Sequence, residues 1–254
     1  MAQQTDSKTI LTLLLKAGQM FLESGAETYR AEDAALYMFN ALHNGEISIF
    51  AVPTMVIIEI TTEDGQVVSA CKRIRRRAIH LGKIEQLNNI VRQVSCGNLN
   101  VPSALAALEE LDHRPAESTL TGLFAVAAVA SAFTLLLGGG ILELLFGFCC
   151  CFLAQLVGLF FRSVSMYQFF NSILGGFVPT LIMLIVGRLL PNVSQEVVII
   201  SSMLPLFPGV AMVNAIRDAI NGDLISGVSR AAEAMMIAVG LGIGGSLIFL
   251  LGVM

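Results

Sequence analysis

The stretch STLTGLFAVAAVASAFTLLL, residues 118–137, contains no charged side chain. A helix rises by about 1.5 Å per residue, so about 20 apolar residues cross the hydrocarbon core of a bilayer. Residues 118–137 therefore have the length and the composition of a transmembrane helix. Four later stretches have the same character, and the sequence predicts five spans, at residues 118–137, 141–161, 165–187, 197–216 and 232–254.

The charged residues are concentrated before the first of these spans. Of the 15 Lys and Arg, 11 lie in residues 1–118, as do 14 of the 19 Asp and Glu. Only 13% of the 254 residues are charged, whereas an ordinary soluble domain has about 25%. The predicted fold is an α-helical integral membrane protein of five transmembrane helices. An N-terminal α+β domain is expected at residues 1–114, and the membrane domain at residues 115–254.

The N-terminal domain carries signals for both helices and strands. Helical periodicity and helix-breaking residues predict four helices, at residues 8–24, 26–43, 77–95 and 102–110. Between the second and the third helix lie three β-rich runs, EISIFAV, TMVIIEITT and QVVSAC. The Asp64-Gly65 pair between the last two runs is a strong hairpin signal. Arg114-Pro115 is the expected hinge into the membrane domain.

Positive charge before the first span sets the predicted orientation. The cluster CKRIRRR, residues 71–77, resists translocation, so the N-terminal domain is expected in the cytoplasm. Five spans then place the C-terminal Met254 outside the cytoplasmic membrane. Three of the four arginines in the rear half agree with this orientation, and only Arg188 would lie outside.

Two prolines interrupt the fourth predicted span. Pro205 and Pro208 each remove a backbone donor, and Gly209 adds local freedom. In a bilayer, freed carbonyls are tolerated only where protein or a water-filled cavity satisfies them. The broken helix is therefore a pointer to a transporter binding site, and a kink that serves only packing is the alternative.

The third predicted span repeats the pattern with two glycines and a proline. Gly175, Gly176 and Pro179 predict a second interrupted helix beside a transport path. Polar side chains in or near the spans complete the predicted substrate path, namely Gln155, Asn171, Asn214, Arg217, Asp218 and Glu143. Arg217 is expected near the cytoplasmic mouth, where its guanidinium would attract the carboxylate of a substrate.

Each of these polar residues also has a structural alternative. The amides can serve helix–helix hydrogen bonding, and Glu143 can be a surface carboxylate. Arg217 can be an anchor paired locally with Asp218 or Asp223. Gly240 and Gly244 form a GxxxG pattern, which is typical of close helix packing rather than of a binding site.

Residue spacing excludes several chemistries. Cys149, Cys150 and Cys151 are consecutive, so their thiols point in different directions around a helix and cannot share one tetrahedral metal ion. Cys71 and Cys96 stand alone, and the three histidines show neither ligand nor nucleophile spacing. No metal, cofactor or catalytic residue is predicted. The basic cluster is short and lies in a net acidic domain, so contact with anionic lipid explains it better than nucleic acid does.

Two motifs resemble a known family. SGAETYRAED occupies residues 24–33, and LPLFPG at residues 204–209 is followed by AIRDAINGDLISGVSR at residues 215–230. Together they resemble the threonine/serine exporter family, over essentially the whole chain. The resemblance carries over onto Ser24, Gly25, Glu27, Thr28, Tyr29 and Arg30 in front, and onto Pro205, Pro208, Gly209, Arg217, Asp218, Gly222 and Asp223 behind. Glu27 and Arg30 lie three apart on a helix, and a simple ion pair is one reading of them.

The resemblance also implies a partner. Full-length members carry a second block of spans, so this chain resembles the large subunit of a split form whose small membrane partner supplies the other half. One bacterial split pair is associated with succinate export, so hydroxy amino acids and dicarboxylates both stay open as substrates. The expected function is export of such solutes without enzyme activity, and self-association into a homo-oligomer stays open. The alternative is a membrane-anchored sensor or enzyme that works through the N-terminal domain.

Overall fold

The computed structural model describes residues 7–62, 65–114, 118–162 and 168–250. The chain forms two compact units. Unit 1 comprises Met1–Pro115 and Met212–Ala231, and unit 2 comprises Ala116–Ala211 and Ala232–Met254. This division differs from a simple split after residue 114, because a segment near the C-terminus packs with the N-terminal part of the chain.

Unit 1 begins with the elements that the sequence predicts, in the predicted order. They are α1 (Ser7–Glu23), α2 (Thr28–Leu42), β1 (Gly45–Val52), β2 (Met55–Thr62), β3 (Val67–Arg73), α3 (Leu81–Ser95) and α4 (Val101–His113). The third helix begins at Leu81 rather than at Arg77, and the fourth runs beyond Glu110 to His113. The expected hinge residue Pro115 lies outside the described residues.

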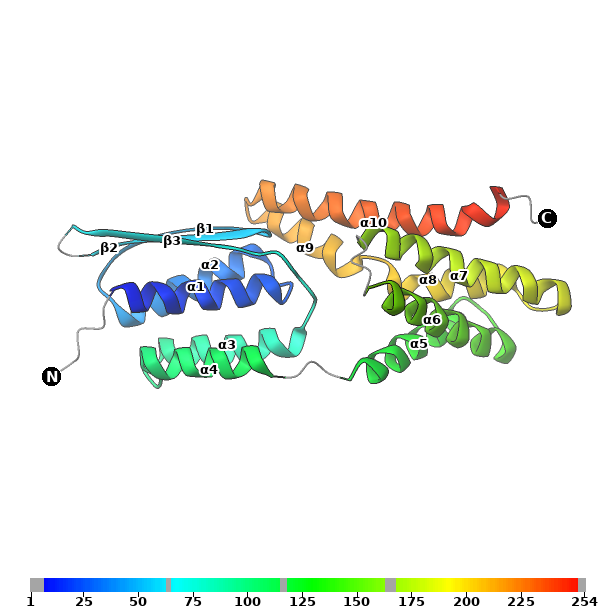
Figure 1. The fold of residues 1–254 in the computed structure, drawn as a ribbon, viewed down its shortest axis with the longest axis horizontal. Coiled ribbons are helices and arrows are strands. Elements are labelled where there is room, and N and C mark those ends of the chain that lie inside the picture. Colours follow the sequence, from blue (N-terminus) through cyan, green and yellow to red (C-terminus); the bar gives the residue numbers. More distant parts are fainter. Residues whose placement is uncertain (1–6, 63–64, 115–117, 163–167, 251–254) are drawn as a thin grey trace. The chain divides into compact units, whose positions relative to one another are not determined.

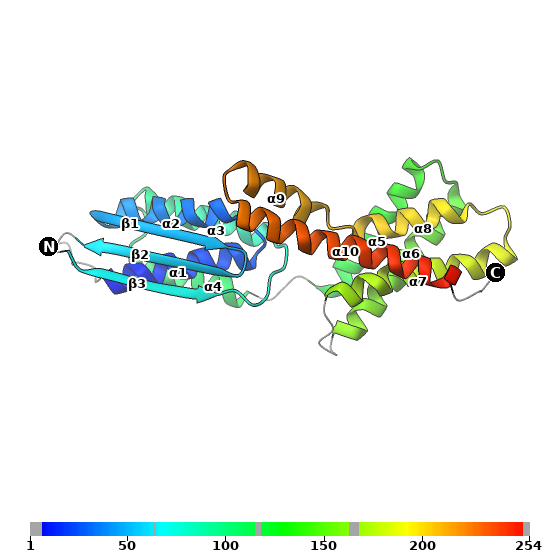
Figure 2. The ribbon, with the colours of Figure 1, turned by 90° about the horizontal axis from the view of Figure 1, so that it is seen from above.

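The three strands form one antiparallel sheet in the order β1-β2-β3 (Figure 2). Its register pairs Ile49 with Ile58 and Ile58 with Ala70, so the apolar side chains of neighbouring strands share one face. Figure 1 shows three layers in this part of unit 1, with α1 and α2 between the sheet and the pair α3 and α4. The central position of α1 explains why residues on several of its faces are buried, including Leu13 and Leu14.

The turn between α1 and α2 is a helix cap built around a glycine. The Ala26 amide donates to the Phe21 carbonyl and the Gly25 amide donates to the Leu22 carbonyl, which together make a Schellman motif. Gly25 has φ of 80°, in the left-handed region that favours glycine. The predicted break at Ser24-Gly25 is confirmed, and it sets the course of the loop that leads into α2.

Unit 2 is built from long apolar helices. The long helices are α5 (Thr119–Leu136), α6 (Ile141–Arg162) and α7 (Gln168–Leu189). The shorter helix α8 (Gln195–Met203) and the 3-10 turn η1 (Leu204–Leu206) follow them. The unit boundaries fall inside α9 (Gly209–Ile220) and α10 (Leu224–Leu250). Among the described residues, four helices are long and apolar enough to span a membrane. The pair Gln195–Leu206 and Gly209–Ile220, bent by 50°, makes a fifth if it counts as one span.

Polar side chains inside unit 2 bond between helices. The Thr134 hydroxyl of α5 donates to the Ser201 hydroxyl of α8 over 2.8 Å, and the Ser202 hydroxyl approaches the Gly147 carbonyl of α6 at 3.4 Å. Large apolar side chains lie outside, with Leu136 and Ile141 each almost four-fifths exposed. This inverted arrangement suits a bilayer, where lipid covers apolar side chains and polar groups face the bundle interior.

Candidate functional site

The break predicted in the fourth span is confirmed. Helix α8 ends at Met203, η1 covers Leu204–Leu206, and α9 begins at Gly209. Phe207 is extended, with φ of −67° and ψ of 139°, because the ring of Pro208 disfavours a helical conformation in the preceding residue. The two prolines thus stop one helix and fix the start of the next.

The second interrupted helix is not present, so that prediction is wrong. Helix α7 continues from Gln168 to Leu189 through both glycines and Pro179. A Cβ atom on Gly176 would overlap the Leu241 carbonyl, and one on Gly244 would overlap the Ile173 carbonyl. These glycines therefore allow the backbones of α7 and α10 to approach closely, and the packing interpretation of the GxxxG pattern is confirmed.

Three further residues of the predicted path have separate surroundings in unit 2. The Glu143 carboxylate accepts hydrogen bonds from the Gly140 amide at 3.0 Å and the Ser194 amide at 3.1 Å, so it caps two helix starts. The Gln155 amide lies 3.8 Å from the Cys151 sulfur. The buried Asn171 Oδ1 makes no hydrogen bond within the described part of the chain. A substrate-path role for these three stays a prediction.

The polar face of α9 binds the loop between α1 and α2. Asn214, Arg217 and Asp218 lie at i, i+3 and i+4, so they share one helix face. The Asn214 Nδ2 donates to the Gly25 carbonyl over 3.1 Å. The Arg217 Nη1 donates to Glu27 Oε1 over 2.6 Å, and Asp218 Oδ1 accepts from the Thr28 amide at 3.2 Å. All these residues belong to unit 1.

Two residues beyond α9 add to these contacts. The Arg230 Nη2 on α10 donates to the Ala26 carbonyl over 2.6 Å, and the Thr28 hydroxyl donates to Asp223 Oδ2 over 3.1 Å. We call the whole set the loop clamp. It consists of residues 25–28 together with Asn214, Arg217, Asp218, Asp223 and Arg230.

A buried ion pair lies at the centre of the loop clamp. The Arg230 Nε lies 2.8 Å from Asp218 Oδ2, and the two side chains are only 6% and 0% exposed. This approach lies off the hydrogen-bond direction, so its attraction is that of two opposite charges. Asp218 also places negative charge at the first amide of α2, where the helix dipole is positive.

Glu27 is a second charged centre of the loop clamp. Its side chain is 7% exposed and lies between two arginines, with Arg30 Nε 2.9 Å from Oε2 and Arg217 Nη1 2.6 Å from Oε1. Burial opposes ionisation of the carboxyl group. The hydrogen bonds from its own amide and from Arg217, with the charges of both arginines, outweigh burial and hold the pKa of Glu27 below its ordinary value.

The structure therefore joins two motifs that the sequence placed apart. The expected pairing of Glu27 with Arg30 is confirmed. Arg217 pairs with Glu27, a partner that neither sequence interpretation of this arginine named. Arg230 was quoted in the rear motif but was not singled out. Its position next to a predicted span was the one signal in the sequence that could have identified it.

Comparisons with known proteins agree with the two motifs. Residues 12–252 match the family of threonine/serine exporters. A protein named as a threonine/serine exporter from Mycobacterium tuberculosis is 22% identical, over 94% of this chain and 45% of its own length. The threonine/serine exporter of Corynebacterium glutamicum is 23% identical, over 96% of this chain and 52% of its own length. The chain thus spans about half the length of these two exporters.

A third relative matches along nearly its entire length. The succinate transporter subunit YjjP of Klebsiella aerogenes is 22% identical, over 96% of this chain and 94% of its own length. No solved structure matches the chain significantly. The family match covers nearly all the described residues, including both halves of the loop clamp and the broken helix. This multi-pass membrane protein belongs to the threonine/serine exporter family, a family of transporters rather than of enzymes.

Proposed function

We propose that this chain is a subunit that exports small carboxylate-bearing solutes across the cytoplasmic membrane. The observation that carries the proposal is the helix interrupted at residues 204–208 and continued by the amphipathic helix α9. Discontinuous helices supply unpaired backbone groups at transporter binding sites. The names of the relatives include threonine, serine and succinate, and all three solutes carry a carboxylate.

The loop clamp supports a mechanical role for the N-terminal elements in this proposal. It attaches α9 to the loop before α2 through residues 190 positions apart. The helix that follows the break is therefore held by a folded α+β body. Arg217 is half-exposed while it contacts Glu27, so its guanidinium also remains accessible to a passing carboxylate.

We also propose that the complete transporter needs a second membrane subunit. The chain spans about half the length of two exporter relatives but almost all of a relative named as a subunit. A unit of five spans begins on one side of the membrane and ends on the other. A second unit of five spans that continues from it therefore has the opposite orientation in the membrane. Inverted repeats with a binding site at their interface are a recurring transporter design.

Vesicles reconstituted with this purified chain alone are expected to show little efflux of threonine or succinate. Efflux is expected to rise at least about tenfold when a small multi-span family member is added, because a half transporter exposes one wall of its path to lipid. Counterflow of radiolabelled solute measures this, and protein-free vesicles are the control. Full flux through the chain alone would show that a homo-oligomer suffices.

The proposed orientation places residues 1–114 in the cytoplasm and the C-terminus outside. Reporter fusions at successive positions are expected to alternate, inside then outside, because positive charge before the first span resists translocation. The fusion sites are Pro115, Gly140, Arg162, Pro191, Asp223 and Met254. An inside signal at Met254 would mean an even number of crossings and would overturn this topology.

A further inference from the structure

Unit 1 has a groove between α2 and α3. Its lining residues lie between positions 30 and 95, far along the chain from the broken helix. Its volume is about 650 Å³, which is the size of a site for a small molecule. The groove is open to solvent along the seam of the two helices. Its polar lining includes Arg30 of the N-terminal motif, and Arg92, Asn88 and Tyr37.

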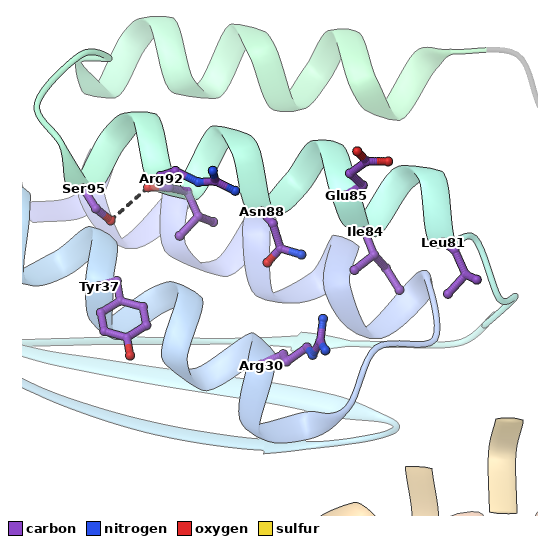
Figure 3. A pocket seen from close by; sticks show the side chains of 9 residues that line it. Arg30, Tyr37, Leu81, Ile84, Glu85, Asn88, Arg92 and Ser95 are labelled. Atoms are coloured by element: carbon purple, nitrogen blue, oxygen red, sulfur yellow. Dashed lines mark hydrogen bonds between the residues drawn. The ribbon is translucent and has the colours of Figure 1, made fainter. Parts of the chain in front are cut away.

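The groove presents cationic and amide donors from opposite helices. Figure 3 shows the Arg30 guanidinium on α2 pointing toward α3, and the Asn88 side chain on α3 pointing toward α2. Arg92 lies four residues after Asn88 and Glu85 three residues before it, so all three share one face of α3. Glu85 also lines the groove, but in Figure 3 its carboxylate points away from α2. The donors directed into the groove therefore favour an anion.

Apolar side chains form the rest of the lining. Leu81 is 70% exposed and supplies an apolar wall of the groove, while Ile84 and Val91 line it but are each only 8% exposed. An ion without an apolar part would leave this wall in water. A ligand with a carboxylate and a short carbon skeleton would satisfy both the donors and the wall, as small-molecule sites usually require.

We propose that this groove binds a small organic carboxylate, of the size of an amino acid or a four-carbon dicarboxylate. The planar fork of arginine holds a carboxylate through two parallel hydrogen bonds, and Arg92 supplies that fork. Arg30 supplies the second cation while its Nε stays 2.9 Å from Glu27. A bound carboxylate would thus share Arg30 with the loop clamp. None of the residues that line the groove belongs to the predicted substrate path, and the ligand class follows from the chemistry of the groove itself.

A single fluorophore in the groove tests this site. The chain has no tryptophan, and Tyr37 is 58% exposed, so Tyr37→Trp adds one reporter at the groove without disturbing the core. The full-length variant in detergent micelles is titrated with succinate and with L-threonine. A saturable fluorescence change is expected with at least one of them. No change is expected with L-threoninol, which lacks the carboxylate, and inorganic phosphate is expected to bind more weakly.

A charge variant locates the binding. Arg92→Gln is expected to weaken the apparent affinity at least about tenfold, as loss of a charge-assisted hydrogen bond does. Arg73→Gln removes the same charge from the exposed end of β3, outside the groove, and is expected to leave the affinity unchanged. Arg92 is preferred to Arg30 because Arg30 also pairs with Glu27.

Equilibrium dialysis of the same solutes against the unmodified chain, with and without Arg92→Gln, gives a second measurement. At least one carboxylate must bind in both assays, and the proposal is overturned if this is not observed. It is overturned too if threoninol or phosphate binds as tightly as the carboxylates. It is also overturned if Arg92→Gln and Arg73→Gln have equal effects. Efflux is measured separately, from vesicles that contain both this chain and the second membrane subunit. Binding without efflux would remove the proposed transport function alone, and efflux without binding would remove this site alone.

Discussion

Replacing Arg230 by Met is expected to lower the free energy of unfolding by about 3–5 kcal/mol. The substitution leaves the Asp218 carboxylate, which is fully buried, without its counter-charge, and an uncompensated buried charge is strongly destabilising. It also removes the donor to the Ala26 carbonyl at the loop before α2. Denaturant titration of the purified chain in detergent measures the change.

Arg217→Gln is the matched control for this prediction. Arg217 also forms an ion pair in the loop clamp, but it is 52% exposed, so water replaces much of the lost interaction. The expected loss is about 0–1 kcal/mol. The double variant Arg230→Met with Asp218→Asn removes both charges and keeps an acceptor for the Thr28 amide. It is expected to be more stable than Arg230→Met alone.

The comparison of these variants decides whether the buried pair supports the fold. Equal stability of Arg230→Met and Arg217→Gln would show that the pair at the centre of the loop clamp contributes no more than a surface contact. A double variant less stable than Arg230→Met would show that Asp218 acts through its contact with the Thr28 amide rather than through Arg230.

Replacing Pro205 and Pro208 together by Ala is expected to reduce export by on the order of tenfold to hundredfold. Alanine restores two backbone donors and favours helix, so α8 would continue through residues 204–208. The displaced start of α9 would then misplace the groups that contact the solute, and displacements of about 1 Å have effects of this size. Efflux from vesicles reconstituted with this chain and the second membrane subunit measures the change, normalised to the amount of inserted protein.

Pro179→Ala is the control for the proline substitution. Pro179 lies inside α7, which stays helical, so its replacement is expected to leave export near the unmodified rate. The variant with both Pro205→Ala and Pro208→Ala is expected to fold at least as well as the unmodified chain, because each proline removes a backbone hydrogen bond. Normal insertion with an unmodified export rate would show that the break is a packing kink and that the solute path lies elsewhere in the bundle.

Features that depend on neighbouring residues could be predicted from the sequence alone. The order of helices and strands in the N-terminal part follows from hydrophobic periodicity and from turn residues such as Gly25 and Gly65. The apolar helices follow from the absence of charge over about 20 residues. The break at residues 204–208 follows from proline chemistry, which removes a backbone donor wherever the ring stands. Each of these causes acts within a few residues along the chain.

Only the tertiary structure decided which polar residues meet. Arg217 has Asp218 and Asp223 nearby in sequence, yet it contacts Glu27, because its position on α9 faces the loop before α2. Gly176 and Pro179 predicted a broken helix, but α7 is continuous, and Gly176 instead lets the α10 backbone approach closely. A charge has many acceptable partners in a sequence, and a glycine fits a kink or a close contact equally well. The fold selects one partner by bringing its charge within about 3 Å, because the attraction between two charges falls as their distance grows.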